Sequence, residues 1–188
     1  MIHDKDQAVE AMIVALSQGE SPIALADYAG PPPPAEFYLS LMREMLDDDG
    51  QAMGAVTFGT ANESGMLPLA NFDAQEALAM LIAARVVGVI PKVAWVAATS
   101  DMWHRRFTDG TTPDDVRHGT LEEMHNAGDT SVTEALMAMC VAPDGPGYDV
   151  LQPYTRTEDG IVWGEVENLS EAEHHGALNE LMTLLVSV

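Results

Sequence analysis

Apolar residues recur at helical spacing in four stretches of this chain, and these stretches predict four helices. The first helix is expected over roughly Asp6 to Gln18, with Gly19 as its stop. Its apolar stripe consists of Val9, Met12, Ile13 and Leu16. The proline run Pro31–Pro34 then forms a stiff spacer before the second helix, about Ala35 to Leu46.

The second helix has Phe37, Leu41 and Met45 on one apolar stripe. It ends in the acidic run Asp47–Asp49, followed by Gly50. Three acids at a helix C-terminus oppose the helix dipole, so this run is a poor choice for stability alone.

The third helix carries the clearest start signal, a capping box formed by Asp73 and Glu76. The stretch Ala74–Val87 is apolar on nearly every side, which predicts a buried central helix that ends at Gly88. The last helix is expected to begin at Ser170, boxed with Glu173. Its apolar positions are Leu178, Leu181, Leu185 and Val188.

Apolar runs with turn signals between them predict strands in the rest of the chain. The expected strands are Val89–Thr99, Val132–Ala142, Tyr148–Arg156 and Ile161–Glu167. Short turns join the last three, so they predict an antiparallel meander to which Val89–Thr99 adds a fourth strand. Pro153 donates no ladder hydrogen bond, which predicts a bulge or an edge position for its strand.

Only the segment Gln51–Ala70 stays ambiguous. Ala55 to Phe58 fits a short strand, whereas Gly54, Gly59 and Gly65 favour a loop.

Together these elements predict an α+β fold. An antiparallel meander sheet of three to four strands packs against the buried central helix and the C-terminal helix, and an N-terminal helical arm precedes them. The predicted arm is residues 1–30, and residues 31–188 form a single α+β domain whose sheet-plus-helix core spans about 71–188.

Charge restricts the partners of this chain more than any motif does. The 188 residues include 30 Asp and Glu but only 8 Lys and Arg, a formal net charge of −22. Such a surface repels phosphate backbones and anionic membranes, so direct nucleic-acid or membrane binding is not expected. With 47% apolar residues the chain can still bury a core, and the acidity therefore does not indicate disorder.

Composition also indicates a cellular setting. Cys140 is the single cysteine, which excludes an internal disulfide and suits the cytoplasm. The longest apolar stretch, Ala77–Ile90, contains Arg85 and is too short to span a bilayer, and the N-terminus lacks a signal-peptide pattern. The scarcity of lysine, with only Lys5 and Lys92, resembles the composition of proteins from GC-rich genomes such as those of actinobacteria, their phages and halophilic archaea.

The common catalytic and phosphate-binding motifs are missing, which lowers the expectation of an enzyme. The best metal candidate is a pair of Glu-x-x-His units, Glu122 with His125 and Glu171 with His174. In a chain with so many acids this spacing also arises by chance, and solvated helix faces explain it better. No cofactor is expected.

The stretch that most resembles a binding site follows the predicted strand Val93–Thr99. It concentrates basic side chains beside an aromatic ring and a histidine, and the arginines supply forked donors for an anion or a partner carboxylate. The candidate residues are Trp103, His104, Arg105, Arg106 and Arg117. The competing interpretation is that Trp103 packs on the core and the arginines pair with nearby acids.

Two further residues in the strand Val132–Ala142 are weighed for chemistry. Cys140 lies among apolar neighbours, and a buried structural thiol is the expectation there. Glu134 either pairs with an arginine of the Trp103 stretch or lies at the solvated start of the strand, and the second is favoured.

Three functions remain open on this basis. The favoured one is a small non-enzymatic accessory protein that acts through contacts with a partner protein, itself basic, and that forms homo-oligomers, if any, through the N-terminal arm. The second is an acidic mimic of nucleic acid that inhibits a DNA- or RNA-binding protein. A metal-dependent enzyme using Glu122, His125, Glu171 and His174 is the weakest of the three.

Overall fold

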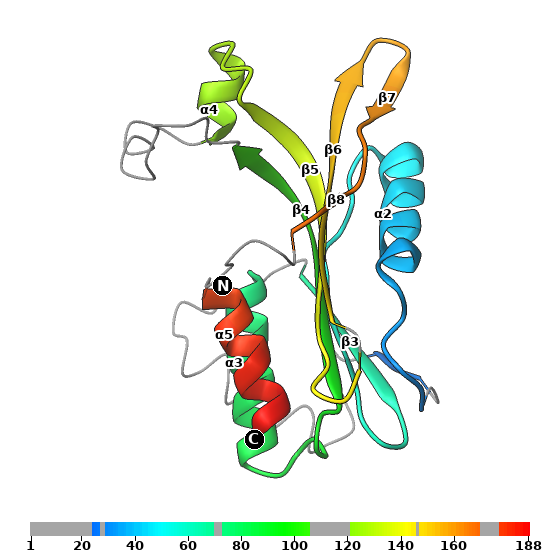
Figure 1. Cartoon of the computed structure of the whole chain (residues 1–188), viewed down its shortest axis with the longest axis vertical. Coiled ribbons are helices and arrows are strands. Elements are labelled where there is room, and N and C mark those ends of the chain that lie inside the picture. The colour runs from blue at the N-terminus through cyan, green and yellow to red at the C-terminus, as the bar shows by residue number, and fades with distance from the viewer. Residues whose placement is uncertain (1–23, 27–28, 70–72, 106–120, 146, 170–176) are drawn as a thin grey trace.

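The computed structural model describes residues 24–26, 29–69, 73–105, 121–145, 147–169 and 177–188. Within this part of the chain, eight strands form one antiparallel sheet in the order β1-β3-β2-β4-β5-β6-β7, with β8 beside β6 (Figure 1). The strands are β1 Ala24–Ala26, β2 Ala55–Gly59, β3 Ser64–Pro68, β4 Trp95–Arg105, β5 Val132–Val141, β6 Tyr148–Thr157, β7 Gly160–Trp163 and β8 Glu167–Asn168.

Helices cover both faces of this sheet. Helix α2 (Ala35–Asp49) lies on one face, whereas α3 (Ala74–Val86) and α5 (Ala177–Ser187) lie together on the other (Figure 1). The short helix α4 (Leu121–Asn126) lies near the end of β4 and the start of β5. The result is a three-layer α+β architecture in which the sheet is the middle layer.

Each face of the sheet has its own hydrophobic core. On the α3–α5 face the largest buried side chains include Phe58, Leu78, Leu81, Met182 and Leu185. On the α2 face the core consists of Tyr38, Leu39, Met42, Leu46, Trp95, Ala97, Leu136, Ala138, Cys140, Val150 and Tyr154. Because successive strand residues point to opposite faces, β4 and β5 contribute to both cores, which explains their continuous apolar runs.

The predicted α+β class and antiparallel sheet are confirmed, but the predicted count of three to four strands is wrong. The glycine-rich segment after α2 forms the hairpin β2–β3 rather than a loop. Its glycines belong to the packing, because a Cβ at Gly59 would overlap the indole of Trp95. Glycine at position 59 therefore makes room for the indole of Trp95. Of the two alternatives left open for this segment, the short strand from Ala55 is the one that the structure shows.

The fourth predicted strand is displaced along the chain. The prediction began at Val89 and stopped at Thr99, whereas β4 covers Trp95–Arg105. Val89 and Ile90 instead donate backbone hydrogen bonds to the Ala84 carbonyl and so close the end of α3. Residues 100–105 continue the strand because β5 is long enough to pair with all of them, up to Arg105 opposite Val132.

The predicted strand Ile161–Glu167 is wrong as a single strand, because it is divided into β7 and β8. The division lies opposite Pro153 of β6, in the interior of the sheet. β7 pairs with the end of β6 and β8 with its middle, and Pro153 lies between the two ladders. Its carbonyl accepts a hydrogen bond from the Gly164 N–H at 2.8 Å. The N and C=O of one strand residue point to the same side, so the missing proline donor faces the gap between β7 and β8.

The helices agree with the sequence pattern where the structure describes them. The capping box of Asp73 and Glu76 is present, and α3 starts at Ala74 as predicted. The predicted helix at residues 6–18 and the predicted start of the last helix at Ser170 lie outside the described residues. Among the described helices, none is long and apolar enough to cross a bilayer.

Candidate functional site

A polar network centred on Tyr154 lies on the α2 face of the sheet. The Tyr154 hydroxyl is 2.8 Å from Asp101 Oδ1 and 3.1 Å from Glu134 Oε1, and it accepts a hydrogen bond from Arg156 Nη2 at 3.2 Å. Only 2% of Tyr154 is exposed. Three neighbouring strands, β4, β5 and β6, thus bring two carboxylates and an arginine to one buried hydroxyl.

The environment fixes the proton of this hydroxyl in place. Burial raises the pKa of Tyr154, and the hydrogen bond that it donates to Asp101 raises that pKa further. Burial is also the main cause that raises the pKa of Asp101, and repulsion from Glu134 adds to it. Tyr154 is therefore a permanent donor near neutral pH, and its burial keeps it from any substrate.

Arg156 connects this network to the end of α2. Its Nε contacts both carboxylate oxygens of Glu134, at 3.0 and 3.1 Å, while Nη1 donates to the Gly50 carbonyl at 2.9 Å. The Asp101 carboxylate accepts a hydrogen bond from the backbone of Ala52. The network therefore holds the segment that follows α2 against the sheet.

Two more polar contacts fix the helix itself. Arg43 Nε donates to Gln152 Oε1 at 2.7 Å, and the Tyr38 and Thr57 hydroxyls lie 2.7 Å apart. With the buried side of the helix packed in the core, α2 is anchored along its whole length. A helix held in this way presents its outer side in one fixed orientation.

The outer side of α2 is partly apolar, although an apolar stripe on a helix is usually the side that is buried. The stripe that identifies the helix contains Phe37 and Leu41, and these side chains are 54% and 45% exposed. The helix buries the adjacent positions Tyr38, Leu39, Met42 and Leu46 instead. Periodicity locates a helix but does not choose between two apolar sides, and here the side with Tyr38 fits the sheet.

Carboxylates surround these exposed apolar side chains. Glu36 and Glu44 lie beside them on the helix, and all three acids of the run Asp47–Asp49 are exposed. The last turn of α2 contains no basic residue. We call Phe37, Leu41 and these five acids the α2 surface; it combines apolar contact area with negative charge.

The side chains of the predicted Trp103 site do not lie together, because they point to both faces of the sheet. These residues belong to β4 rather than to a loop, so Trp103 and Arg105 face the α2 side whereas His104 faces the opposite side. Trp103 packs against His125, with ring centroids 4.8 Å apart. Arg106 and Arg117 lie outside the described residues.

Arg105 is occupied within the chain. Its Nε donates to the Ser131 hydroxyl at 3.3 Å, and its Nη2 lies 3.7 Å from Asp129 Oδ2. Hydrogen bonds from Ser131 hold the pKa of Asp129 below its usual value. These contacts favour the packing interpretation of the Trp103 stretch over anion binding at Arg105.

The proposed metal quartet is only half described. Glu122 and His125 lie on α4, and both are exposed. His125 Nδ1 lies 3.0 Å from the Val132 carbonyl. Glu171 and His174 fall outside the described residues, and within the described ranges no three His, Cys, Asp or Glu side chains gather as metal ligands would.

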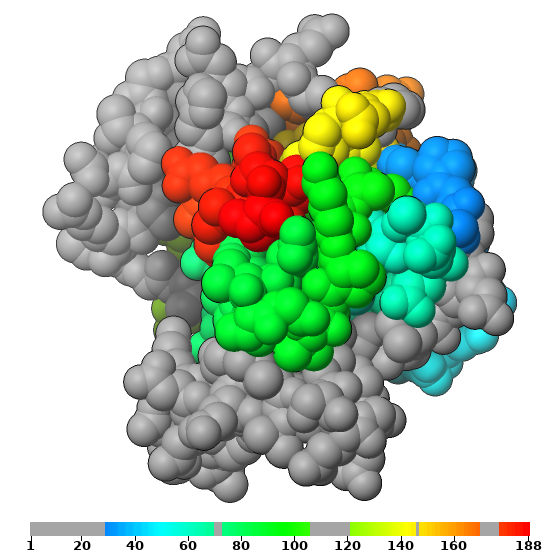
Figure 2. Space-filling model, turned by 90° about the horizontal axis from the view of Figure 1, so that it is seen from below, coloured from blue at the N-terminus to red at the C-terminus, as the bar shows by residue number. Residues whose placement is uncertain are grey.

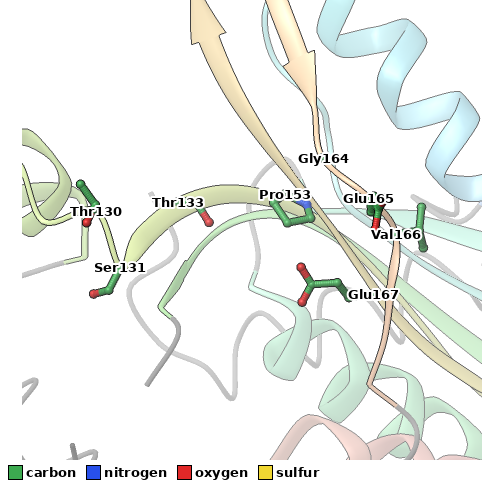
Figure 3. A pocket seen from close by; sticks show the side chains of 8 residues that line it. All are labelled: Thr130, Ser131, Thr133, Pro153, Gly164, Glu165, Val166 and Glu167. Atoms are coloured by element: carbon green, nitrogen blue, oxygen red, sulfur yellow. The ribbon is translucent and has the colours of Figure 1, made fainter. Parts of the chain in front are cut away.

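A shallow hollow of about 490 Å³ opens where the edge strand is interrupted (Figure 3). Thr133 and Glu167 point into it from opposite walls, and Pro153 lies between them (Figure 3). The other lining residues are Thr130, Ser131, Gly164, Glu165 and Val166. Its lining contains hydroxyl and carboxylate groups but no histidine, cysteine or arginine.

The two residues weighed in β5 have structural roles. Cys140 is buried, as predicted, and burial raises the pKa of its thiol to about 11, so the thiolate nucleophile is scarce at neutral pH. Glu134 does pair with an arginine, but with Arg156 of β6 rather than with one of the Trp103 stretch. The favoured alternative, a solvated strand start, is therefore wrong, because β6 lies directly beside this end of β5.

Sequence reasoning missed both the Tyr154 network and the exposure of the α2 surface. A usable signal for the network was the placement of polar residues in otherwise apolar strands, Asp101 and Glu134 among them. No such signal distinguishes the two sides of α2. Compared with protein-family models, with curated proteins and with solved structures, the chain matches none of them.

Proposed function

We propose that this chain is a protein-binding module that holds a basic partner on the α2 surface. The observation that carries the proposal is the exposure of Phe37 and Leu41 on a helix that is otherwise firmly anchored. An apolar strip on one side of a helix, framed by charge, is how helices dock into grooves of other proteins. The partner surface is an apolar groove rimmed by lysine or arginine.

Charge supports the basic character of the partner. The acids at the end of α2 oppose the helix dipole and cost about 0.3–1 kcal/mol of stability each. Exposed carboxylates also steer a basic protein toward this surface and raise the rate of association. A binding role gives these acids a purpose that stability does not.

Binding explains the polar groups better than catalysis does. Tyr154 is buried, and the guanidinium groups of Arg43, Arg105 and Arg156 are each engaged by a carboxylate. The hydrogen bonds of the network run between strands and to the end of α2, so they brace the helix. Their arrangement favours a rigid scaffold.

One observation favours the second candidate, a nucleic-acid mimic. Asp47, Asp48 and Asp49 form a dense exposed cluster of negative charge. A mimic, however, needs carboxylates along one face at phosphate-like intervals, with about 1.7 Å of duplex axis per charge. On the outer side of α2 the exposed positions 37 and 41 are apolar instead. Phe37 and Leu41 therefore favour a partner with an apolar groove.

The proposal is tested with two synthetic probes of equal positive charge. One is poly-lysine, and the other is an amphipathic helical peptide of leucine and lysine that adds an apolar stripe. We expect the wild-type chain to bind the leucine-lysine peptide more tightly, as measured by calorimetry. The double substitution Phe37→Ala and Leu41→Ala should weaken this binding about tenfold or more, as losses above about 1 kcal/mol per anchor residue imply.

A matched control is Val162→Ala, which removes an equally exposed apolar side chain (59%) on β7, outside the α2 surface. It should leave the affinity for both probes unchanged. If the double variant binds the leucine-lysine peptide as tightly as the control does, the α2 surface is not the docking site. Equal binding of both probes by the wild-type chain would favour the charge-only mimic instead.

A further inference from the structure

The proline run that precedes α2 is docked against the sheet. The Trp95 indole donates a hydrogen bond to the Gly30 carbonyl at 2.9 Å, and the Tyr148 hydroxyl donates one to the Pro33 carbonyl at 3.0 Å. In Figure 2 the blue segment that contains this run lies beside the yellow segment that includes the start of β6. We call residues 30–34 the proline strap.

The spacing of these two donors matches the repeat of a polyproline helix. Trp95 starts β4 and Tyr148 starts β6, and both strands run antiparallel to β5 between them, so the two starts lie at the same end of the sheet. Two strand spacings separate the donors by about 9.6 Å. A polyproline II helix has three residues per turn and rises about 3.1 Å per residue, so carbonyls three residues apart face one side at about 9.3 Å. Pro34 has this conformation, with φ −64° and ψ 154°.

Both donors belong to the core on the α2 face. Trp95 is 3% exposed, and Tyr148 packs partly buried against the same hydrophobic cluster. Burial raises the pKa of Tyr148 above its usual value, so its hydroxyl keeps its proton and stays a donor at neutral pH. Buried donors need acceptors, and the strap carbonyls supply them. The sheet therefore holds the strap by the same aromatic donors and carbonyl spacing with which proteins bind proline-rich peptides.

The strap ends where the first turn of α2 begins. Pro34 is the N-cap of this helix, and a proline ring carries no oxygen, so it cannot supply the side-chain hydrogen bond of an ordinary cap. The Phe37 amide donates to the Pro34 carbonyl at 3.0 Å. The same turn carries the exposed Phe37 ring of the α2 surface. The position of the strap therefore sets the position of that ring.

We infer that the proline strap takes the place of a helix cap, and that Tyr148 and Trp95 are positioning residues for binding at the α2 surface. The effect on binding rests on the proposed function, whereas the effect on the first turn of α2 needs no partner. When the strap is released, the first turn frays, and Phe37 is in its binding position for only a fraction of the time. The apparent dissociation constant then rises by the inverse of that fraction.

Tyr148→Phe tests this inference, because it removes one hydroxyl and leaves the ring in the core. We expect faster hydrogen exchange at the amides of residues 37–39 in the first turn of α2, and an unchanged rate at the Gly50 amide at its other end. The affinity for the leucine-lysine peptide, measured by calorimetry, should fall about three- to tenfold, as the loss of one hydrogen bond implies. The control Val186→Ala truncates a side chain in the core on the opposite face, and should lower the melting temperature without changing this affinity.

A double substitution shows whether the strap acts through Phe37. Because the strap positions this ring, Tyr148→Phe should weaken binding in the wild-type chain but not in the Phe37→Ala variant. An equal loss in both backgrounds overturns the inference, and so does an unchanged exchange rate or an unchanged affinity in Tyr148→Phe itself. A wild-type chain that binds no leucine-lysine peptide overturns the proposed function and the positioning role with it, but faster exchange in the first turn would still establish the strap as the substitute for a cap.

Discussion

The hydroxyl of Tyr154 illustrates how burial decides what one side chain can do. The same group exposed in a cleft would be a candidate acid, yet here it is 2% exposed and held between Asp101 and Glu134. Arg156 balances one of the two carboxylates. The remaining negative charge, on a half-buried Asp101, is destabilising at neutral pH because burial and Glu134 both disfavour it.

Asp101→Asn should therefore change the pH dependence of stability. Since the folded state raises the pKa of Asp101 above its unfolded value of about 3.9, its carboxyl favours folding most at low pH and loses that contribution as pH rises through the folded pKa. The neutral amide avoids this loss. We expect the melting temperature of Asp101→Asn, relative to wild type, to be higher at pH 7 than at pH 4.

Glu36→Gln serves as a control, because its effect on stability should depend on pH in the opposite direction. The hydrogen bond from Arg43 lowers the pKa of Glu36, so this carboxylate stabilises the fold at neutral pH and loses its effect as pH falls. The effect is small because Glu36 is exposed. If the melting temperature of Asp101→Asn, relative to wild type, rises as pH falls, the raised pKa of Asp101 in the folded state is contradicted.

The helices show how the same apolar pattern leads to different outcomes. In α3, apolar residues surround the helix, and five positions from Ala77 to Ala84 are buried against the sheet and α5. In α2, two apolar sides exist and only one is buried. The difference follows from the layers: α3 shares its face with α5, whereas α2 is the one helix on the other face among those that the structure describes, and it leaves one side exposed (Figure 1).

Asp48→Lys should separate stability from binding in α2. A cation near the helix C-terminus interacts favourably with the dipole, so we expect the free energy of unfolding to rise by about 0.3–1 kcal/mol in urea titrations. The same substitution should weaken binding of the leucine-lysine peptide. A loss of stability would show that the acidic run has a structural partner and would remove the argument that binding explains it.

At the level of the complete protein, the negative surface charge is the main influence on how stability depends on salt. The described arginines are engaged inside the chain, which leaves the carboxylates as the main charged groups facing solvent. Self-repulsion of this size destabilises the compact state and is relieved by screening. The hydrophobic cores on the two faces of the sheet must therefore carry the stability at low salt.

Two salt-dependent outcomes follow for the complete protein. The melting temperature should rise between about 0.01 M and about 0.15 M NaCl as the Debye length shrinks from about 30 to about 8 Å. The chain should also show no affinity for a short DNA duplex at about 0.15 M salt, because the electrostatic contribution is repulsive. A gel shift at micromolar concentration or below, or a melting temperature that falls with salt, would contradict this description.

Local signals predicted much of the fold. Helical periodicity and the Asp73–Glu76 capping box located α3, and the turn residues located the β5–β6–β7 meander. These signals act over a few residues, and the structure confirms them there. The Asp-Gly turn before β7 and the apolar run of β5 needed no knowledge of distant partners.

Contacts between distant segments decided the rest. The sequence by itself determined the α+β class, the negative surface and the position of most elements, because propensity, turns and charge are local properties. Only the tertiary structure decided that β4 runs on to Arg105, since that depends on the length of β5, and that the hairpin β2–β3 joins the sheet. It also decided which side of α2 is buried and that Tyr154 lies between Asp101 and Glu134, because both depend on which strands become neighbours.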